Sequence, residues 1–333
     1  MKRDFSHLLT QIEEQYQFED KDGSGLTSLL EGLADPHTKG VIYWDYIEVD
    51  TLLSLQKTRT TYPDEVIFIV YHQIHELYFK LIIQELEKIT RPNEPNLNFN
   101  DWKRSLERST RYVYKLIESF DIMRFGLDGE EFQKFRKALL PASGFQTHQF
   151  RLIEIMLTSF DNLIKEDAVD ENGNLLKNPL EKMVLNKNNF NHIYWRKGVI
   201  NVDSGKEAKI LINFNNKYDR LFFDELKFYS ESNVYSGYLN SPDDFKISVA
   251  PYMIGLEESI LMWKIAHLNT VRTQITDMRG TGGTEWRKYL PLKNQKISYF
   301  PVFWADKDID VEIRRMKKEL PETMIGEIRQ LLR

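Results

Sequence analysis

The segment Phe68–Lys80 constrains the fold of this chain more than any other part of its sequence. It places two histidines, His72 and His75, and one glutamate, Glu76, within an otherwise apolar run. A titratable group in apolar surroundings costs free energy unless another group pairs with it. The segment therefore predicts a helix that lies beside a cofactor or a buried polar network.

The start of this helix is indicated by Pro63 and the two acidic residues that follow it, which suit the first turn of a helix. We expect the helix to run to about Lys88. Phe68 and His72 are four residues apart and share a face, so one ligand could contact both. A histidine on an apolar face can also be purely structural, with its ring bonded to a backbone carbonyl, and the local pattern leaves both interpretations open.

Composition excludes several classes of protein. With 333 residues, 41% hydrophobic and 13% aromatic, the chain can bury a large, aromatic-rich core. The net charge of -5 is spread along the sequence, so we expect no nucleic-acid partner. The chain has no cysteine, which excludes disulfides, thiolate nucleophiles, zinc ribbons, iron–sulfur clusters and cysteine-ligated haem. Any metal or haem must therefore be held by histidine or by oxygen ligands.

The N-terminus and the hydropathy pattern predict the location of the protein. Residues 1–5 become polar too early for a signal peptide, and we find no run of about 18 apolar residues that would span a membrane. We therefore expect a cytoplasmic protein with no membrane partner.

Helical spacing of apolar residues dominates the chain and strand patterns are scarce. An N-terminal helix over 3–16 and a loosely ordered arm form a first region, 1–42, and the helical domain occupies 43–333. Within that domain, a helix is predicted over 102–123, helical spacing resumes over 207–229, and a long helix is predicted over 248–278, ended by Gly280. The polar stretch 165–206 reads as a surface insertion with one short helix over 180–184. The fold class predicted is an all-α helical bundle.

A shorter helix should begin at Asp128, because Glu131 stands three residues later in a capping-box pattern. It carries Phe132 and Arg136 four residues apart and ends before Pro141. An aromatic ring with a guanidinium beside it can bind a carboxylate bidentately. Most arginines in such positions are surface residues, so this pattern alone does not assign a clamp.

Three of the seven histidines, His72, His75 and His267, lie in long apolar helices. The motifs of zinc proteases and of carboxylate-bridged di-iron bundles are absent. His72, His75 and Glu76 could supply a facial triad in number, but their directions diverge on one helix. Haem needs only one neutral imidazole and an apolar slot. His267 suits that role because Trp263 lies on the same face, although a structural core histidine would show the same spacing.

Four blocks of sequence, taken together, resemble the tryptophan 2,3-dioxygenase family over most of the chain from Tyr43 to about Tyr289. They are Tyr43–Ile47 with Leu52–Gln56; Phe68–Lys80; Phe132–Arg136 with Pro141–Gln146 and Gln149–Arg151; and Trp263–His267 with Gly280–Gly283.

The resemblance implies a haem b enzyme that inserts both atoms of O₂ across the C2–C3 bond of the L-tryptophan indole, giving N-formyl-L-kynurenine, the first step of kynurenine-route degradation. It implies a haem pocket between long helices, one haem per subunit, with His267 as the iron ligand. His72 would bind the indole N–H on the opposite side of the haem. The family's substrate-binding and haem-binding positions correspond here to Phe68, Ile69, Val70, Tyr71, Phe132, Arg136 and Thr281 for the substrate, and to Ser143, Gly144, Arg151, Trp263 and Tyr289 for the haem.

The resemblance also implies a homotetramer, a dimer of dimers, in which Tyr43, Tyr46 and Ile47 of an exchanged N-terminal segment reach a neighbouring site. The chain departs from the family pattern after Gly283, where Thr284-Glu285-Trp286 replaces the usual Ser-Ser-Gly, and at His75, where a hydroxyl-bearing residue is usual. Two alternatives stay open: a related haem oxygenase acting on a modified indole or another aromatic amino acid, and a non-enzymatic helical scaffold.

Overall fold

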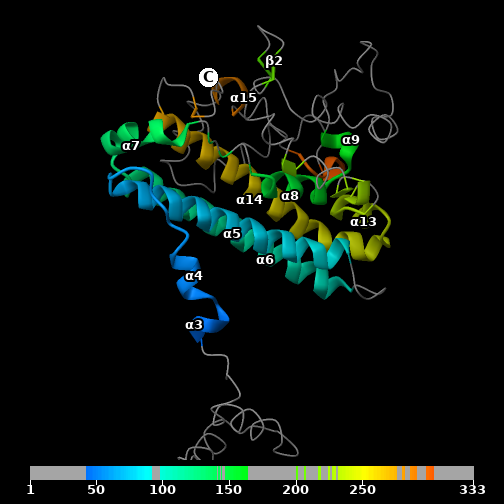
Figure 1. Ribbon diagram of the computed structural model, residues 1–333. Coiled ribbons are helices and arrows are strands. Elements are labelled where there is room, and N and C mark those ends of the chain that lie inside the picture. The colour runs from blue at the N-terminus through cyan, green and yellow to red at the C-terminus, as the bar shows by residue number, and fades with distance from the viewer. Residues whose placement is uncertain are drawn as a thin grey trace, which may run out of the picture. The chain divides into compact units, whose positions relative to one another are not determined.

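Three long helices are the main elements of the described chain, as the computed structural model shows (Figure 1). They are α5 (Asp64–Thr90), α6 (Phe99–Phe125) and α14 (Asp243–Ile275). Helix α6 packs along both α5 and α14, and α8 (Gln149–Leu157) packs on α5. The structure describes residues 43–91, 98–140, 142, 144, 147–163, 200–201, 206–207, 217–218, 224–225, 227–229, 232–275, 280–281, 286–290 and 298–303.

Shorter elements surround these helices. They are α7 (Gly129–Phe135), the 3-10 helix η1 (Arg136–Leu139), α9 (Phe160–Leu163), α13 (Val234–Leu239), α15 (Trp286–Tyr289) and the 3-10 helix η4 (Pro301–Phe303). A two-residue antiparallel pair joins β1 (Ile200–Asn201) to β2 (Lys206–Glu207), with Ile200 opposite Glu207. The all-α prediction is confirmed, since this pair is the only β-structure in the part of the chain described.

The chain divides into two compact units, residues 1–57 and 58–333. In the first, the described part contains α3 (Tyr43–Tyr46) and α4 (Val49–Leu53), and none of the residues in these two helices is buried. The predicted division after residue 42 remains a prediction. The helices predicted over 3–16 and 180–184 lie outside the described residues.

The predicted helix starts agree with the structure to different degrees. Helix α5 begins at Asp64 directly after Pro63, as expected, and Asn98 caps α6 by accepting a hydrogen bond from the Asp101 amide. Helix α14 begins five residues earlier than the predicted 248, with two aspartates in its first turn. The polar start and the internal Pro251 concealed this first part from the apolar periodicity.

The core is rich in aromatic side chains, as the composition predicted. Phe120, Phe135, Tyr229, Tyr299 and Phe300 are each at most 1% exposed. Among the helices described, α5 is also long and apolar enough to cross a membrane, judged by length and composition alone, which the search for an apolar run did not anticipate. The core helix of a bundle has the same composition, and α5 packs against α6 and α8.

Candidate functional site

The ring of His72 is held in one tautomer by its own helix. Its Nδ1 lies 2.7 Å from the carbonyl oxygen of Phe68, one turn earlier on α5. A carbonyl only accepts hydrogen bonds, so Nδ1 carries the proton and Nε2 keeps a lone pair. Burial lowers the pKa of His72, which keeps the ring neutral at pH 7. The contact to a backbone carbonyl is the one expected of a structural histidine, yet it also leaves Nε2 as a hydrogen-bond acceptor.

An aromatic and cationic cluster lies beside His72. The ring of Phe68 is centred 4.1 Å from the His72 ring and is stacked 5.9 Å from Phe132. The guanidinium carbon of Arg136 lies 5.9 Å from the centre of the Phe132 ring. Arg136 is only 8% exposed, and its burial lowers its pKa, although an arginine remains charged at pH 7. The fold thus brings an imidazole acceptor, two aromatic rings and a buried cation together.

The starts of α5 and α7 bind each other, and this holds the cluster in place. Asp128 caps α7 by accepting hydrogen bonds from the Glu130 and Glu131 amides. The Asp64 carboxylate accepts from the Asp128 amide at 2.6 Å, while the Glu131 carboxylate accepts from the Asp64 amide at 3.4 Å. The predicted capping residue is confirmed, but Glu131 reaches the other helix. Arg136 follows as the first residue of η1, where α-helical geometry ends.

His75 points away from the His72 and Phe68 face and into the helix bundle. Its Nε2 lies 2.8 Å from the Ser119 hydroxyl of α6, which itself donates to the Leu116 carbonyl. Ser119 therefore accepts from His75, so Nε2 carries the proton. Burial first, and then the nearness of His72 and His267, lower the pKa of His75 to about 3.

Glu76 takes a third direction. Its carboxylate accepts hydrogen bonds from the Thr147 hydroxyl at 2.9 Å and from Gln149 Nε2 at 2.7 Å, just before and within α8. The divergence expected for His72, His75 and Glu76 is therefore confirmed. No group of three histidines or carboxylates that could hold a metal ion occurs in the described segments.

His267 is held by rings rather than by hydrogen bonds. It stacks on Trp263 at 5.4 Å with 13° between the planes, and on Phe120 of α6 at 6.0 Å with 27°. Burial, with a smaller effect from His72, lowers the pKa of His267 to about 4, so the ring is neutral at pH 7. None of the described residues hydrogen-bonds its ring nitrogens. A neutral imidazole with a lone pair among aromatic rings fits the haem ligand that the resemblance implies.

The structure describes some of the other predicted site residues and leaves two of them out. Arg151 is buried at 8% exposure and donates to the Thr147 carbonyl at 2.7 Å. A side chain at Gly144 would meet none of the described residues within 4 Å. Thr281 donates its hydroxyl to the Ala142 carbonyl at 2.6 Å. Ser143 and the side chain of Tyr289 lie outside the described part of the chain.

The other predicted substrate residues differ in their exposure and in the faces they occupy. Val70 is 37% exposed, and residues two apart on a helix face nearly opposite sides, so it does not share the face of Phe68. Ile69 is half-buried, and Tyr71 is buried against His75 and Phe120. Tyr43, Tyr46 and Ile47 belong to the first unit, where they are exposed.

Ser119 and Phe120 are the site residues that the sequence did not reveal. In the sequence, Phe120 looks like any other apolar position of a helix, and a serine in a helix carries no signal. The presence of His75 in an apolar run indicated that a polar partner exists, but nothing in the sequence located that partner 44 residues away.

Comparison with known proteins identifies the family of this chain. A family model described as tryptophan 2,3-dioxygenase matches residues 28–227. A tryptophan 2,3-dioxygenase of Ruegeria sp. (strain TM1040) is 26% identical over 283 residues, covering 79% of this chain and 90% of the relative. That of Bacillus thuringiensis subsp. konkukian (strain 97-27) is 28% identical over 283 residues, covering 82% and 94%. That of Sorangium cellulosum (strain So ce56) is 41% identical over 135 residues, covering 38% and 32%.

The family match covers more than half of the chain, and it includes α5, α7 and η1, which carry the cluster around His72. The chain belongs to the tryptophan 2,3-dioxygenase family.

Proposed function

We propose that this protein is a haem-dependent dioxygenase that cleaves the C2–C3 bond of the L-tryptophan indole with O₂ to give N-formyl-L-kynurenine, at the start of kynurenine-route degradation. The carbon–carbon bond breaks, each of its two carbons gains one oxygen atom, and no external electron donor is needed. The observation that carries this proposal is the cluster of His72, Phe68, Phe132 and Arg136, which matches the groups of an indole amino acid.

Each group in the cluster has a counterpart on the substrate. The His72 Nε2 lone pair accepts a hydrogen bond from the indole N–H, because Nδ1 is committed to the Phe68 carbonyl. Phe68 and Phe132 offer apolar ring faces to the indole. Arg136 pairs bidentately with the carboxylate in a site from which water is largely excluded. Fixing both ends of the substrate turns the encounter into a positioned reaction.

His267 is the proposed iron ligand for one haem b per subunit. The haem, when bound, supplies the O₂ chemistry. Trp263 and Phe120 contact the His267 ring and each other, and their contacts restrict its orientation. Arg151, Ser143, Gly144 and Tyr289 are proposed to approach the haem and its propionates.

The remaining parts of the proposal concern further substrate contacts and assembly. Thr281 is proposed to meet the ammonium and carboxylate of the substrate. Ile69, Val70 and Tyr71 are proposed to bind the substrate. Tyr43, Tyr46 and Ile47 are proposed to complete a neighbouring subunit's site. The first two are more than 70% exposed, which suits side chains that are covered in an assembly. We propose a cytoplasmic homotetramer, a dimer of dimers. Light scattering would measure the mass of this assembly.

Two measurements on purified protein test this function. A Soret band that shifts on addition of dithionite and CO is expected, and its absence from protein supplied with haem would contradict the proposal. O₂ uptake on addition of L-tryptophan should then match N-formylkynurenine formation mole for mole. A haem protein that consumes O₂ only with another indole or aromatic amino acid would instead identify the alternative substrate class.

A further inference from the structure

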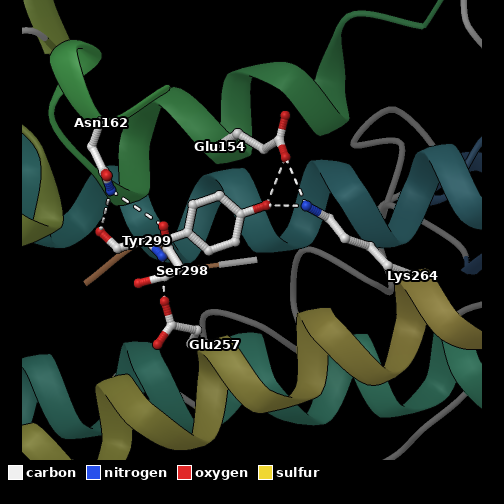
Figure 2. Close-up of polar contacts among 6 residues, drawn as sticks. All are labelled: Glu154, Asn162, Glu257, Lys264, Ser298 and Tyr299. Carbon is white, nitrogen blue, oxygen red and sulfur yellow. Dashed lines mark hydrogen bonds and ion pairs between the residues drawn. The ribbon is translucent and has the colours of Figure 1, made fainter. Parts of the chain in front are cut away.

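A buried polar network lies one helical turn from His267 and takes no part in the proposed chemistry (Figure 2). Lys264 of α14 is 2% exposed. Its Nζ lies 3.0 Å from Glu154 Oε1 of α8 and 2.6 Å from the hydroxyl of Tyr299. That hydroxyl donates to the same Glu154 oxygen at 2.6 Å. Figure 2 shows the three side chains converging from two helices and one irregular segment.

Tyr299 is itself fixed through its backbone. The Glu257 carboxylate of α14 accepts hydrogen bonds from the amides of Tyr299 and Phe300. Asn162 of α9 donates to the carbonyls of Ser298 and Tyr299 at 3.2 and 3.3 Å. Both the amides and the carbonyls of the segment 298–300 are therefore hydrogen-bonded. This fixes the position of the Tyr299 hydroxyl, to which Lys264 binds.

The network connects to His267 through a short series of contacts. The Lys264 ammonium lies 5.6 Å from the centre of the Phe150 ring, and Phe150 lies 4.6 Å from Trp263. Trp263 in turn stacks on His267. Lys264 directly follows Trp263 and precedes His267 by three residues, so any displacement of Lys264 moves the helical turn that carries both rings.

Stability alone does not account for such a group. Replacing a buried ion pair by apolar residues of similar volume often leaves a protein as stable or more stable, while removing one partner destabilises it. Buried polar contacts instead select one arrangement among several that apolar packing would tolerate. The three side chains here join α14 to α8 and to residues 298–300, so the arrangement they would select is how α14 lies against those two segments.

We propose that Lys264, Glu154 and Tyr299 are positioning residues that fix the orientation of His267 toward the haem iron. This inference rests on the proposed role of His267 as iron ligand. Its signature is the iron–histidine bond, whose vibration responds to the orientation and environment of the imidazole.

Resonance Raman spectroscopy of the ferrous haem-loaded protein tests the proposal. The iron–histidine stretching band of Lys264→Met and of Tyr299→Phe should be displaced or broadened while haem is retained, with the larger change in Lys264→Met. Lys246→Met is the matched control, because Lys246 forms an ion pair with Asp243 in the first turn of the same helix. Its band should equal that of the unmodified protein.

A triple variant separates positioning from stability. Lys264→Met, Glu154→Leu and Tyr299→Phe together replace the three converging polar side chains by apolar ones, so the Tm should recover relative to Lys264→Met alone while the band stays displaced. Recovery of both together would overturn the positioning role, as would an unchanged band in both single variants. If Lys264→Met does not fold, Tyr299→Phe decides, since it deletes one oxygen atom and keeps the ring. If the unmodified protein lacks the band, the proposed ligand is wrong and the inference fails with it.

Discussion

The histidines of α5 and the histidine of α14 are held by different forces. On α5, His72 and His75 each commit one ring nitrogen to a hydrogen bond, to the Phe68 carbonyl and to the Ser119 hydroxyl. On α14, His267 packs against the rings of Trp263 and Phe120, which also contact each other, and none of the described residues hydrogen-bonds it. Hydrogen bonds select a tautomer, whereas stacking selects an orientation. A fixed tautomer suits a ring that must accept a hydrogen bond, and a fixed orientation suits a ring that must bind a metal.

The largest effect is expected from replacing His267 with glycine, which tests whether this ring binds the iron. The variant should lose the Soret spectrum of the normal haem complex because it has no imidazole. Added imidazole should restore the band, since the Trp263 and Phe120 rings remain to receive the free ligand. Absorption spectra with and without imidazole measure this. Full haem binding and an unchanged spectrum in the variant alone would disprove the ligand assignment.

Removing the buried cation near His72 should have the next largest effect. Arg136→Ala should raise KM for L-tryptophan by a factor equivalent to about 2–5 kcal/mol, because a desolvated charge pair is lost. Haem content should not change. Arg136→Lys is the control that keeps the charge and loses the bidentate geometry, so its KM should fall between the two. Steady-state kinetics measure all three, and equal KM values would exclude the clamp.

Replacing His75 should change the response of stability to acid. The pKa of His75 is about 3 in the folded protein, against 6.5 for an ordinary histidine. The unfolded chain therefore binds the extra proton first, so stability is complete above about pH 6.5 and declines by about 1.4 kcal/mol per pH unit below it.

His75→Phe should remove that part of the decline. It leaves Ser119 bonded to the Leu116 carbonyl, so no polar group of the pair is left without a partner. Urea unfolding of both proteins between about pH 7 and pH 5 measures the difference. Parallel curves for the two proteins would show that His75 is not buried in its neutral form.

The smallest effect is expected at the acceptor nitrogen of His72. His72→Phe should raise KM for L-tryptophan by a factor equivalent to about 1 kcal/mol, the usual net contribution of one hydrogen bond. The same change should leave KM for 1-methyltryptophan unaltered, since that analogue has no indole N–H. Kinetics with both substrates give the comparison. A similar loss for both would indicate that His72 acts through packing rather than as an acceptor.

The sequence predicted the elements of this fold better than the contacts between them. Periodicity and capping residues located α5, α6 and α7, because those signals lie within each helix. Glu154 and Tyr299 lie 110 and 35 residues from Lys264, and no local pattern joins them. The segment around Tyr299 is irregular, so it has no period to detect. Long-range polar contacts of this kind depend on how the helices pack. Helix packing is determined by many residues together, and no single local pattern shows it.

The mutual binding of the α5 and α7 starts has a consequence for local unfolding. Asp64 and Glu131 each accept a backbone amide of the other helix, so neither first turn can open while the other keeps its hydrogen bonds. Amide hydrogens in the two turns should then exchange with solvent through one shared opening. Arg136 lies eight residues beyond Asp128, so the same opening would release the proposed carboxylate clamp. Substrate bound there would slow amide exchange at the far end of the contact, in the first turn of α5.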